Sequence, residues 1–426
     1  MPSPLSDGRS RSRWRSPWFL GGAALLALVA AAAVAWLLVF SPEEDVSNTD
    51  VAFQAETAPA ETTPPEKTTD WPWYGYNKAR TRYLPAEPDF KPPFKRLWSF
   101  RSDVLIEFSP IIVRDTLYVT RNSGGLYALN SKTGKVKWTK RVGKLNASSP
   151  AYDKGRIFAV TLKPGRITAL RAKDGKVLWR KKLPGRSESS PVVNGGKVFF
   201  GCECGKMFAY DVKSGRKVWE RELDDAVKAA PAYSDKTLYV GDYSGKMWAL
   251  KTADGSVRWS SDSLSSGFGR AGSFYSTPAV AFGRVYVGST DGRVYSYSKS
   301  DGKLAWSFST GAFVYAGPAV ADTPRTDPTV YIGSYDKKFY ALDAKTGKVR
   351  WKHNAGGKIS GAATVVGETV YYSNLGRRRT TGLSTRTGKK VYGIRRGAFN
   401  PIVSDGKRIY LTGYSQIYGL KPTDDE

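Results

Sequence analysis

Two cysteines that flank a glutamate, Cys202, Glu203 and Cys204, are the side chains best suited to metal or redox chemistry. Outside the cytoplasm, thiols this close could form a small disulfide, and with the carboxylate they could bind a soft metal such as copper. We favour a structural or incidental role, because the residues around them read as a turn between two strands. The sequence holds no other cysteine, so disulfides cannot hold the whole protein together.

The single histidine, His353, limits the remaining chemistry. One histidine excludes histidine-rich metal clusters, and a Ser-His-Asp triad could use only this residue. It stands in an Arg-Trp-Lys-His run near the expected end of a strand. We therefore predict that His353 is exposed and has no functional role.

The charge of the chain is strongly unbalanced. Its formal net charge is +28, of which residues 1–16 carry +3 and residues 41–70 carry −7, which leaves +32 for residues 71–426. A body this basic should attract anionic surfaces and polymers. Solubility or a general compositional bias explains the charge equally well, so it does not select a function by itself.

Residues 17–40 predict a membrane anchor, because they contain no charged side chain and are rich in Ala, Leu and Val. A helix of this length is about 36 Å long and can cross a bilayer. Four arginines precede it and three acids follow it, so residues 1–16 form a basic cytoplasmic tail and the remainder lies outside. A cleaved signal peptide is the alternative, with Ala33-Val34-Ala35 as its cleavage pattern, but the apolar run continues past it.

Residues 41–70 are rich in Thr, Pro, Glu and Ala and contain few aromatic residues. Such a composition cannot bury a core, so we expect a disordered acidic linker. The folded domain should therefore span residues 71–422.

The elements that would position any site are set by an aromatic residue that recurs about every forty residues. The recurring residues are Trp98, Trp138, Trp179, Trp219, Trp259, Trp306, Trp351 and Tyr392. A period near forty that is built from short strands indicates a radial or linear array. In the copy around Trp219, strands are expected at 190–193, 197–201, 207–210 and 217–220, with turn residues between them. Four antiparallel strands per copy are typical of a propeller blade.

Counting the first strands predicts an eight-bladed ring. Their markers are Pro110, Pro150, Pro191, Pro231, Pro278, Pro318, Ala363 and Pro401. The last copy ends before its fourth strand, whereas 95–100 has the fourth-strand pattern and precedes the first copy. We therefore predict an all-β, eight-bladed propeller that is closed by strands from both ends of the chain, which leaves no free edge between blades.

The recurring residues have structural roles in this interpretation. Each Trp should pack between neighbouring blades, at a cost of about 3–5 kcal/mol if it is truncated to Ala. The glycine four residues before each Trp should supply a positive φ in a tight turn. These positions build blades and do not form a binding code.

The copies resemble the pyrroloquinoline-quinone (PQQ) repeat. Residues 127–138 match that motif and residues 340–351 match it best, while the opening segment 71–77 is similar to the start of such domains. The resemblance covers 71–422 and implies a PQQ-like propeller. It is closer to the outer-membrane protein assembly propeller, a lipoprotein scaffold that binds protein partners without a cofactor, than to the quinoprotein dehydrogenases. The present chain departs from that scaffold because it has a predicted helix in place of a lipid anchor.

The dehydrogenases, as the resemblance implies, need a catalytic Asp, Glu and Asn ligands for calcium, and a ring of adjacent cysteines beneath the cofactor. Here the two cysteines are separated by Glu203. The acids expected near the channel are Glu107, Glu188, Asp224 and Asp225, and they form no such set. We therefore expect no PQQ, no metal and no catalytic residues.

One face of the ring should carry the fourth-to-first and second-to-third loops, which vary between copies. These loops mix aromatic and basic residues, which are common at protein interfaces. The candidate binding face consists of Lys163, Arg166, Phe268, Arg270, Phe274, Tyr275, Phe313, Tyr315, Arg377, Arg378, Arg379, Arg395, Arg396 and Phe399.

Taken together, these features predict a monomeric, membrane-anchored, extracytoplasmic propeller that is a non-catalytic protein-interaction scaffold of the cell envelope. Binding of an anionic envelope polymer or of lipid headgroups is the alternative. A quinoprotein enzyme is the third hypothesis. A body this basic could bind nucleic acid, but the expected compartment argues against it, so nucleic acid is not expected as a partner.

Overall fold

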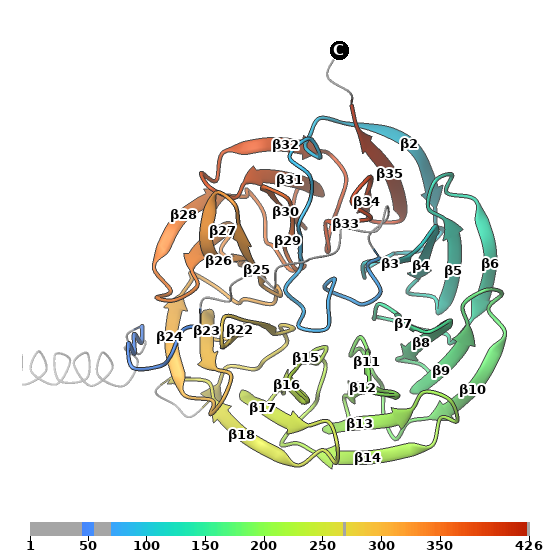
Figure 1. The fold of residues 1–426 in the computed structure, drawn as a ribbon, viewed down its shortest axis with the longest axis horizontal. Helices are drawn as coiled ribbons and strands as arrows, with labels where there is room; N and C mark the ends of the chain where they lie inside the picture. Colours follow the sequence, from blue (N-terminus) through green and yellow to red (C-terminus); the bar gives the residue numbers. More distant parts are fainter. Residues whose placement is uncertain (1–44, 55–69, 267–269, 424–426) are drawn as a thin grey trace, which may run out of the picture. The chain divides into compact units, whose positions relative to one another are not determined.

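Eight antiparallel sheets stand around a common centre in the computed structural model, which describes residues 45–54, 70–266 and 270–423 (Figure 1). The predicted eight-bladed propeller is confirmed. Two short strands outside the blades, β19 (Ser265–Ser266) and β20 (Arg270–Ala271), pair with each other. We number the blades 1 to 8 along the chain.

Each blade has four strands, counted from the centre outward. The innermost strands are β3 (Ile111–Val113), β7 (Ala151–Asp153), β11 (Val192–Asn194), β15 (Ala232–Ser234), β21 (Ala279–Ala281), β25 (Ala319–Thr323), β29 (Thr364–Val366) and β33 (Ile402–Ser404). The second strands are β4 (Thr116–Thr120), β8 (Arg156–Thr161), β12 (Lys197–Cys202), β16 (Thr237–Gly241), β22 (Arg284–Gly288), β26 (Thr326–Gly333), β30 (Thr369–Asn374) and β34 (Ile409–Thr412).

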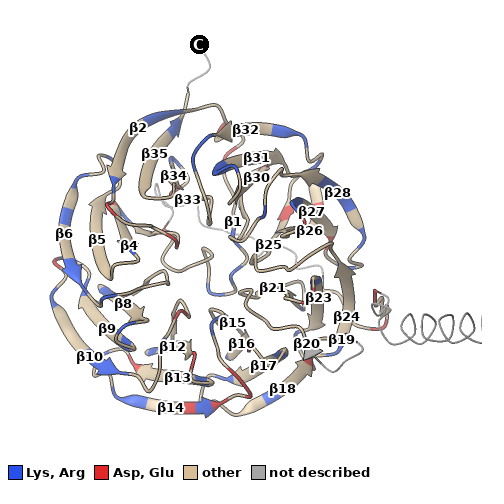
Figure 2. Ribbon diagram, turned by 180° about the vertical axis from the view of Figure 1, so that it is seen from behind, with Lys and Arg blue, Asp and Glu red and all other residues tan. Residues whose placement is uncertain are grey.

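The third strands are β5 (Gly125–Asn130), β9 (Arg166–Arg171), β13 (Lys206–Asp211), β17 (Lys246–Lys251), β23 (Arg293–Ser298), β27 (Lys338–Asp343), β31 (Arg379–Ser384) and β35 (Gln416–Pro422). The outermost strands are β6 (Val136–Arg141), β10 (Val177–Lys182), β14 (Lys217–Glu222), β18 (Val257–Asp262), β24 (Leu304–Ser309), β28 (Val349–Asn354), β32 (Lys390–Ile394) and β2 (Phe94–Arg101). The second and third strands are almost wholly buried, because each blade is covered on both faces by its neighbours. The outermost strands are mostly exposed and carry many of the Lys and Arg residues (Figure 2).

The two ends of the chain close the ring as predicted. Strand β2 pairs antiparallel with β35, and Trp98 lies opposite Gly419. The last blade therefore has the order β2, β35, β34, β33. This pairing removes the free edge that an open array would leave.

Seven of the recurring tryptophans join each blade to the next by the same contact. Each indole Nε1 donates to a backbone carbonyl in the turn between the third and fourth strands of the following blade, and its ring packs on the glycine of that turn. The donors and acceptors are Trp98 and Ser131, Trp138 and Ala172, Trp179 and Val212, Trp219 and Thr252, Trp259 and Lys299, Trp306 and Ala344, and Trp351 and Thr385.

The turn glycine is required for two reasons, as Gly215 illustrates. Its φ is +67°, which disfavours other residues. A Cβ there would lie 2.6 Å from Cδ2 of Trp179, so the indole also excludes a side chain. The sequence predicted the first reason but not the second. Tyr392 takes the place of the Trp in blade 7. The third and fourth strands of blade 8, β35 and β2, are not consecutive in the chain, so no turn between them offers a carbonyl to a donor. The Tyr392 ring instead lies 5.3 Å from the ring of Phe94.

Residues 71–84 cross the centre of the ring, which the sequence did not predict. Six innermost strands each donate the backbone N–H of their second residue to this segment, which ends in β1 (Tyr83–Leu84). The donors and acceptors are Ile112 and Trp71, Tyr152 and Pro72, Tyr233 and Lys78, Val280 and Ala79, Val320 and Thr81, and Val365 and Arg82. We call residues 71–84 the plug segment.

Two arginines of the plug segment, Arg80 and Arg82, are buried completely. Arg80 donates from Nε to the carbonyl of Pro231, at 3.0 Å, and from Nη2 to those of Ser190 and Pro191. Arg82 donates to the carbonyl of Pro318, also at 3.0 Å. Desolvation lowers the pKa of Arg80 to about 9, and the positive charge of Arg82 adds to this effect. The two guanidinium groups thus tie the plug segment to carbonyls of blades 3, 4 and 6.

Residues 45–54, part of the expected disordered linker, pack on blade 5. Ser47 forms an antiparallel bridge with Trp306 of β24. Arg284 donates to the carbonyl of Ala52 at 2.8 Å, and Val51 is only 8% exposed. The prediction of a disordered linker is therefore wrong for these ten residues, because their few apolar side chains find a surface that composition does not reveal. Residues 41–44 and 55–69 of the linker and the expected helix at 17–40 lie outside the described residues, and within the described part no helix is long and apolar enough to span a membrane.

Candidate binding face around the central channel

The fourth-to-first and second-to-third loops share one face of the ring, as the strand order predicted. Backbone hydrogen bonds join the two kinds of loop in blade after blade. The N–H of Tyr335 donates to the carbonyl of Phe313, that of Tyr243 to Ala226, and that of Leu375 to Lys358. This face therefore presents a continuous surface around the channel.

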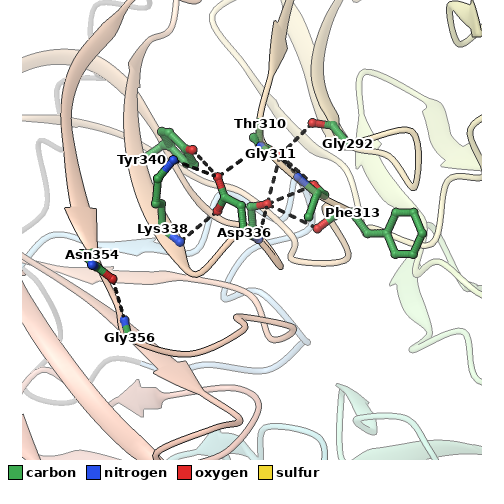
Figure 3. Close-up of polar contacts among 11 residues, drawn as sticks. Gly292, Thr310, Gly311, Phe313, Asp336, Lys338, Tyr340, Asn354 and Gly356 are labelled. Carbon is green, nitrogen blue, oxygen red and sulfur yellow. Dashed lines mark hydrogen bonds and ion pairs between the residues drawn. The ribbon is translucent and has the colours of Figure 1, made fainter. Parts of the chain in front are cut away.

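The loop that enters blade 6 is held firmly by polar contacts (Figure 3). The Thr310 hydroxyl lies 2.8 Å from the carbonyl oxygen of Gly292 and 2.7 Å from that of Ala312. The N–H of Gly311 donates to a carboxylate oxygen of Asp336, which also accepts from the Tyr340 hydroxyl. These contacts fix the shape of the loop.

Phe313 projects from this fixed loop, and its ring points away from the polar cluster (Figure 3). It is 50% exposed, the largest value among the exposed large hydrophobic residues of the described chain. Six of the others stand one or two residues before a blade Trp or Tyr, so the repeat accounts for them. These six are Leu97, Val136, Leu178, Val257, Val349 and Val391. Phe313 has no such structural explanation, and a rigidly presented aromatic ring is a typical interface anchor.

Aromatic rings continue from Phe313 toward the channel. Tyr315 lies at its centre, with ring centroids 5.8 Å from Phe313, 5.5 Å from Tyr275 and 4.9 Å from Tyr335. Lys358 holds its Nζ 5.3 Å from the centroid of the Tyr335 ring, a cation–π contact. Together with Phe399 and Glu107 these residues line an open cleft of about 740 Å³, which we call the aromatic cleft. Its size is in the range of sites for small ligands or for a few side chains of a partner.

Below the aromatic cleft the channel narrows to a cavity of about 50 Å³. Tyr74 of the plug segment lines this cavity, and the Arg82 guanidinium lies 5.0 Å from the centroid of its ring. The plug segment therefore closes the cleft from below. A space this small has room for little more than water.

The carboxylates near the channel are engaged. Glu188 lies 3.5 Å from Nζ of Lys228 and accepts a hydrogen bond from the Tyr275 hydroxyl at 3.3 Å. Burial raises the pKa of Glu188, and the positive charge of Lys228 opposes this increase only in part. Burial and the Glu188 charge raise the pKa of Tyr275, so its hydroxyl remains a donor. Glu107 accepts from the side-chain amide of Asn122 at 3.1 Å.

The other groups considered for chemistry are also accounted for. Asp224 pairs with Lys246, and Asp225 accepts from the backbone N–H of Ala226. A disulfide joins Cys202 and Cys204 at the end of β12, so neither thiol is free. Across the described residues no three His, Cys, Asp or Glu side chains come together as a metal-binding group.

His353 is partly buried, which corrects the expectation that it is exposed. It lies opposite Phe339 in the ladder between β27 and β28, and its ring centroid is 6.2 Å from that of Tyr372 in blade 7. Desolvation lowers its pKa, and the nearby positive charge of Lys390 adds to this effect.

The structure separates the predicted face residues into groups. Tyr275, Phe313, Tyr315 and Phe399 come together in the aromatic cleft. The prediction that Phe274 belongs to the binding face is wrong, because this side chain is fully buried in the core between blades 4 and 5. A Cβ added at Gly241 would lie 2.3 Å from the Cβ of Phe274. A loop aromatic can point inward as readily as outward, and composition does not tell which.

The remaining face residues do not join the aromatic cleft. Lys163 and Arg166 stand at the second-to-third turn of blade 2 and line neither the cleft nor the cavity below it. Arg378, Arg395 and Arg396 line a separate pocket, described below, whereas Arg377 and Arg379 do not line it. Phe268 lies outside the described residues, and only the backbone of Arg270 is described.

Sequence reasoning missed Tyr243, Tyr335 and Lys358, which complete the aromatic surface. The sequence contained a signal for the two tyrosines. They stand at the same position of the second-to-third turn as Asn122, Glu203 and Thr290 in blades 1, 3 and 5, where the residue is not aromatic. The aromatic residues that depart from the repeat are therefore the ones that reach the face.

Comparisons with known proteins agree with this architecture. A family model described as outer membrane protein assembly factor BamB matches residues 95–230, 224–320 and 315–424. The crystal structure of BamB from Moraxella catarrhalis superposes with a TM-score of 0.65 at 18% identity, covering 79% of this chain and 99% of that one. A europium-containing methanol dehydrogenase superposes with a TM-score of 0.70 at 16% identity, covering 83% and 98%.

Among curated proteins, quinoprotein glucose dehydrogenase of Escherichia coli (strain K12) is 30% identical over 139 residues. The match covers 29% of this chain and 18% of the dehydrogenase, so the chain spans well under two thirds of that protein. At these identities the solved structures show the fold alone.

Proposed function

The chain belongs to the family described as outer membrane protein assembly factor BamB, a family of PQQ-repeat propellers, and from this premise we propose that it is a non-catalytic scaffold. It binds a protein partner of the cell envelope through the aromatic cleft and the loops around it. The observation that carries the proposal is the rigid presentation of the half-exposed Phe313 beside a cluster of tyrosines. Aromatic anchors of this kind supply most of the binding energy at protein interfaces.

The proposed absence of a cofactor is supported by a poor fit of the described residues to PQQ. Quinoprotein dehydrogenases of this fold would need adjacent cysteines and a set of calcium ligands in the channel. Here the disulfide spans an intervening Glu203 in a turn of blade 3, and Glu107 and Glu188 are bound to Asn122 and Lys228. The plug segment occupies the channel below the cleft.

The proposal includes anchoring of the protein in the membrane by residues 17–40. The N-terminus of the chain then lies in the cytoplasm and the propeller lies outside it. Its support is the uncharged apolar segment between four arginines and three acids. The disulfide between Cys202 and Cys204 is consistent with an oxidising compartment. Protease treatment of intact and permeabilised cells tests the orientation, because only an extracytoplasmic propeller is digested without permeabilisation.

The scaffold role is tested by capture of partners from envelope fractions with three forms of the full chain. The wild type is compared with F313A/Y315A, which removes the anchor, and with L178A, which removes a side chain of similar exposure on the outer strand β10. We expect F313A/Y315A to weaken capture of a specific protein by at least about tenfold, as loss of hot-spot residues does. L178A should have no effect. Equal capture by all three forms would refute the assignment of the cleft.

Binding of an anionic polymer is the second candidate, which the net charge of +28 favours. Salt separates the two, because polymer binding by dispersed charge collapses between low and moderate salt whereas an aromatic interface tolerates it. The enzyme hypothesis is tested by reconstitution with PQQ and calcium followed by a dye-linked alcohol oxidation assay. Turnover in that assay would overturn the non-catalytic proposal.

A further inference from the structure

The segment that forms most of blade 7 and the innermost strand of blade 8 has an extreme charge. From residue 369 to residue 404 the sequence contains no Asp or Glu, while it carries Arg377, Arg378, Arg379, Arg386, Lys389, Lys390, Arg395 and Arg396. In other blades some surface cations pair with carboxylates, as Lys246 does with Asp224 and Arg350 with Asp343. Within the described residues none of the arginines at 377–379 and 395–396 forms an ion pair with a carboxylate.

Three of these arginines converge on one pocket of about 280 Å³. Arg378, Arg395 and Arg396 line it together with Tyr414, Ser415, Gln416 and Tyr418. We call it the arginine pocket. Its lining contains no acid, and it shares no residue with the aromatic cleft. A pocket on the opposite turns of blades 6 and 7 provides the contrast: it also has three arginines, but Asp322 and Asp327 accompany them.

Two of the three guanidinium groups of the arginine pocket are oriented in advance. Arg396 donates from Nε to the Tyr418 hydroxyl at 3.0 Å and from Nη1 to the carbonyl of Arg395 at 2.8 Å. Arg378 stacks on the Tyr414 ring with its Cζ 4.3 Å from the centroid. Both contacts hold a planar fork in place and leave N–H groups exposed to solvent. Pre-oriented forks lower the entropy that binding an oxyanion would cost.

The backbone of Arg378 adds an independent observation. Its φ is +45°, at the last position of the second-to-third turn, where blades 1, 3, 4 and 5 have Gly124, Gly205, Gly245 and Gly292 with positive φ and blade 6 has Lys337 with a φ of +70°. Glycine is the residue that adopts this conformation without strain. Blade 7 instead places an arginine there, which accepts strain in the turn and puts a guanidinium over the pocket.

From these contacts we propose that the arginine pocket binds the phosphate group of a phosphate ester. Three guanidinium groups suit the several oxygens of a phosphate better than the two of a carboxylate, and arginine forks match phosphate geometry. Ser415 and Gln416 line the same space and can hydrogen-bond the hydroxyls of the esterified group. The volume admits a phosphate with one adjoining unit, such as a sugar or the polar part of a lipid headgroup. This binding does not depend on capture of a protein partner by the aromatic cleft.

The test uses the full chain and two sources of the same chemistry. Glucose 1-phosphate in solution is titrated by calorimetry at low salt, with glucose as its uncharged counterpart. Vesicles of phosphatidylcholine with and without phosphatidylglycerol are tested by co-sedimentation. We expect the wild type to bind glucose 1-phosphate, phosphatidylglycerol vesicles or both, and to bind neither glucose nor phosphatidylcholine alone. Which of the two binds identifies the source of the phosphate.

Two sets of variants separate a built site from general positive charge. R378A/R395A/R396A removes the pocket's forks, whereas K140A/R141A/K181A removes three charges from the outer strands β6 and β10. The pocket variant should bind at least about tenfold more weakly, because each fork makes charge-assisted hydrogen bonds, and the outer-strand variant should bind as the wild type does. R378K/R396K keeps both charges but loses the forks, so it should show an intermediate loss and serves if the triple variant does not fold.

The proposal is overturned if the wild type binds neither phosphate probe, if glucose binds as well as glucose 1-phosphate, or if both triple variants lose binding equally. Partner capture by F313A/Y315A is measured separately. Failure of one experiment therefore leaves the other conclusion intact.

Discussion

Replacing Gly215 by alanine tests whether the contact between Trp and the turn glycine holds neighbouring blades together. The new Cβ would lie 2.6 Å from Cδ2 and 2.7 Å from Cε3 of Trp179, closer than any unstrained contact. The indole would have to move, and its 3.1 Å hydrogen bond to the carbonyl of Val212 would be lost. The residue would also be forced into a φ of +67°.

The expected cost follows from these three effects. The backbone conformation costs about 1 kcal/mol, overpacking about 1–3 kcal/mol, and the lost hydrogen bond about 1 kcal/mol. G215A should therefore lower the free energy of unfolding by about 3–5 kcal/mol, measured by urea unfolding followed by far-UV circular dichroism. Because the ring distributes its stability over seven such joints and the contact of Tyr392, the loss should appear as a shift of the whole transition.

The matched control is G155A in the first turn of blade 2. Gly155 has a φ of +81° and nothing within 4 Å of an added Cβ, so only the backbone effect applies, about 1 kcal/mol. A second check combines G215A with W179A, in which the clash is absent, so the cost of the glycine change should fall to that of G155A. Equal costs for G215A and G155A in the wild-type background would refute the role assigned to the contact.

Three further predictions concern the channel and the rim. R80A should destabilise the protein by about 3–5 kcal/mol in thermal unfolding, because it strips donors from buried carbonyls of the channel wall, and R80K should restore little since one ammonium cannot reach them all. Because burial raises the pKa of Glu188, the folded protein keeps this carboxyl protonated to a higher pH than the unfolded chain does. The stability of the wild type should therefore decline as the pH rises above 4.5, the ordinary pKa of the group. E188Q should flatten that part of a profile of melting temperature against pH, and an unchanged profile would contradict the raised pKa. V51D should release residues 45–54 from blade 5, seen as faster limited proteolysis there with a propeller transition lowered by less than about 2 kcal/mol.

The sequence carried enough information for the fold because a repeated local pattern is sufficient to specify a blade. The period of Trp and Gly, the alternating strands and the missing last strand led to eight blades and to the pairing of Trp98 with the C-terminal strand, which is confirmed. Each of these features depends on residues that are close in sequence or that recur at a constant interval. Tyr392 replaces a Trp at the joint to blade 8, whose third and fourth strands, β35 and β2, are not joined by a turn.

The candidate site was predicted only in part. Phe313, Tyr315 and the arginines at 378, 395 and 396 were selected because loops rich in aromatic and basic residues vary between copies. That signal could not tell that Phe274 turns inward while Tyr275 faces the cleft, since adjacent residues in an extended loop point to opposite sides. It also could not separate the aromatic cleft from the arginine pocket.

By itself, the amino-acid order determined a closed ring of eight blades, the joints between them and the face on which the variable loops gather. Only the tertiary structure decided that Arg80 and Arg82 plug the channel, that residues 45–54 lie on blade 5, and that three arginines share one pocket. The physical reason is that these contacts join segments separated by up to hundreds of residues, and their partners are backbone carbonyls and neighbouring side chains that no local pattern identifies.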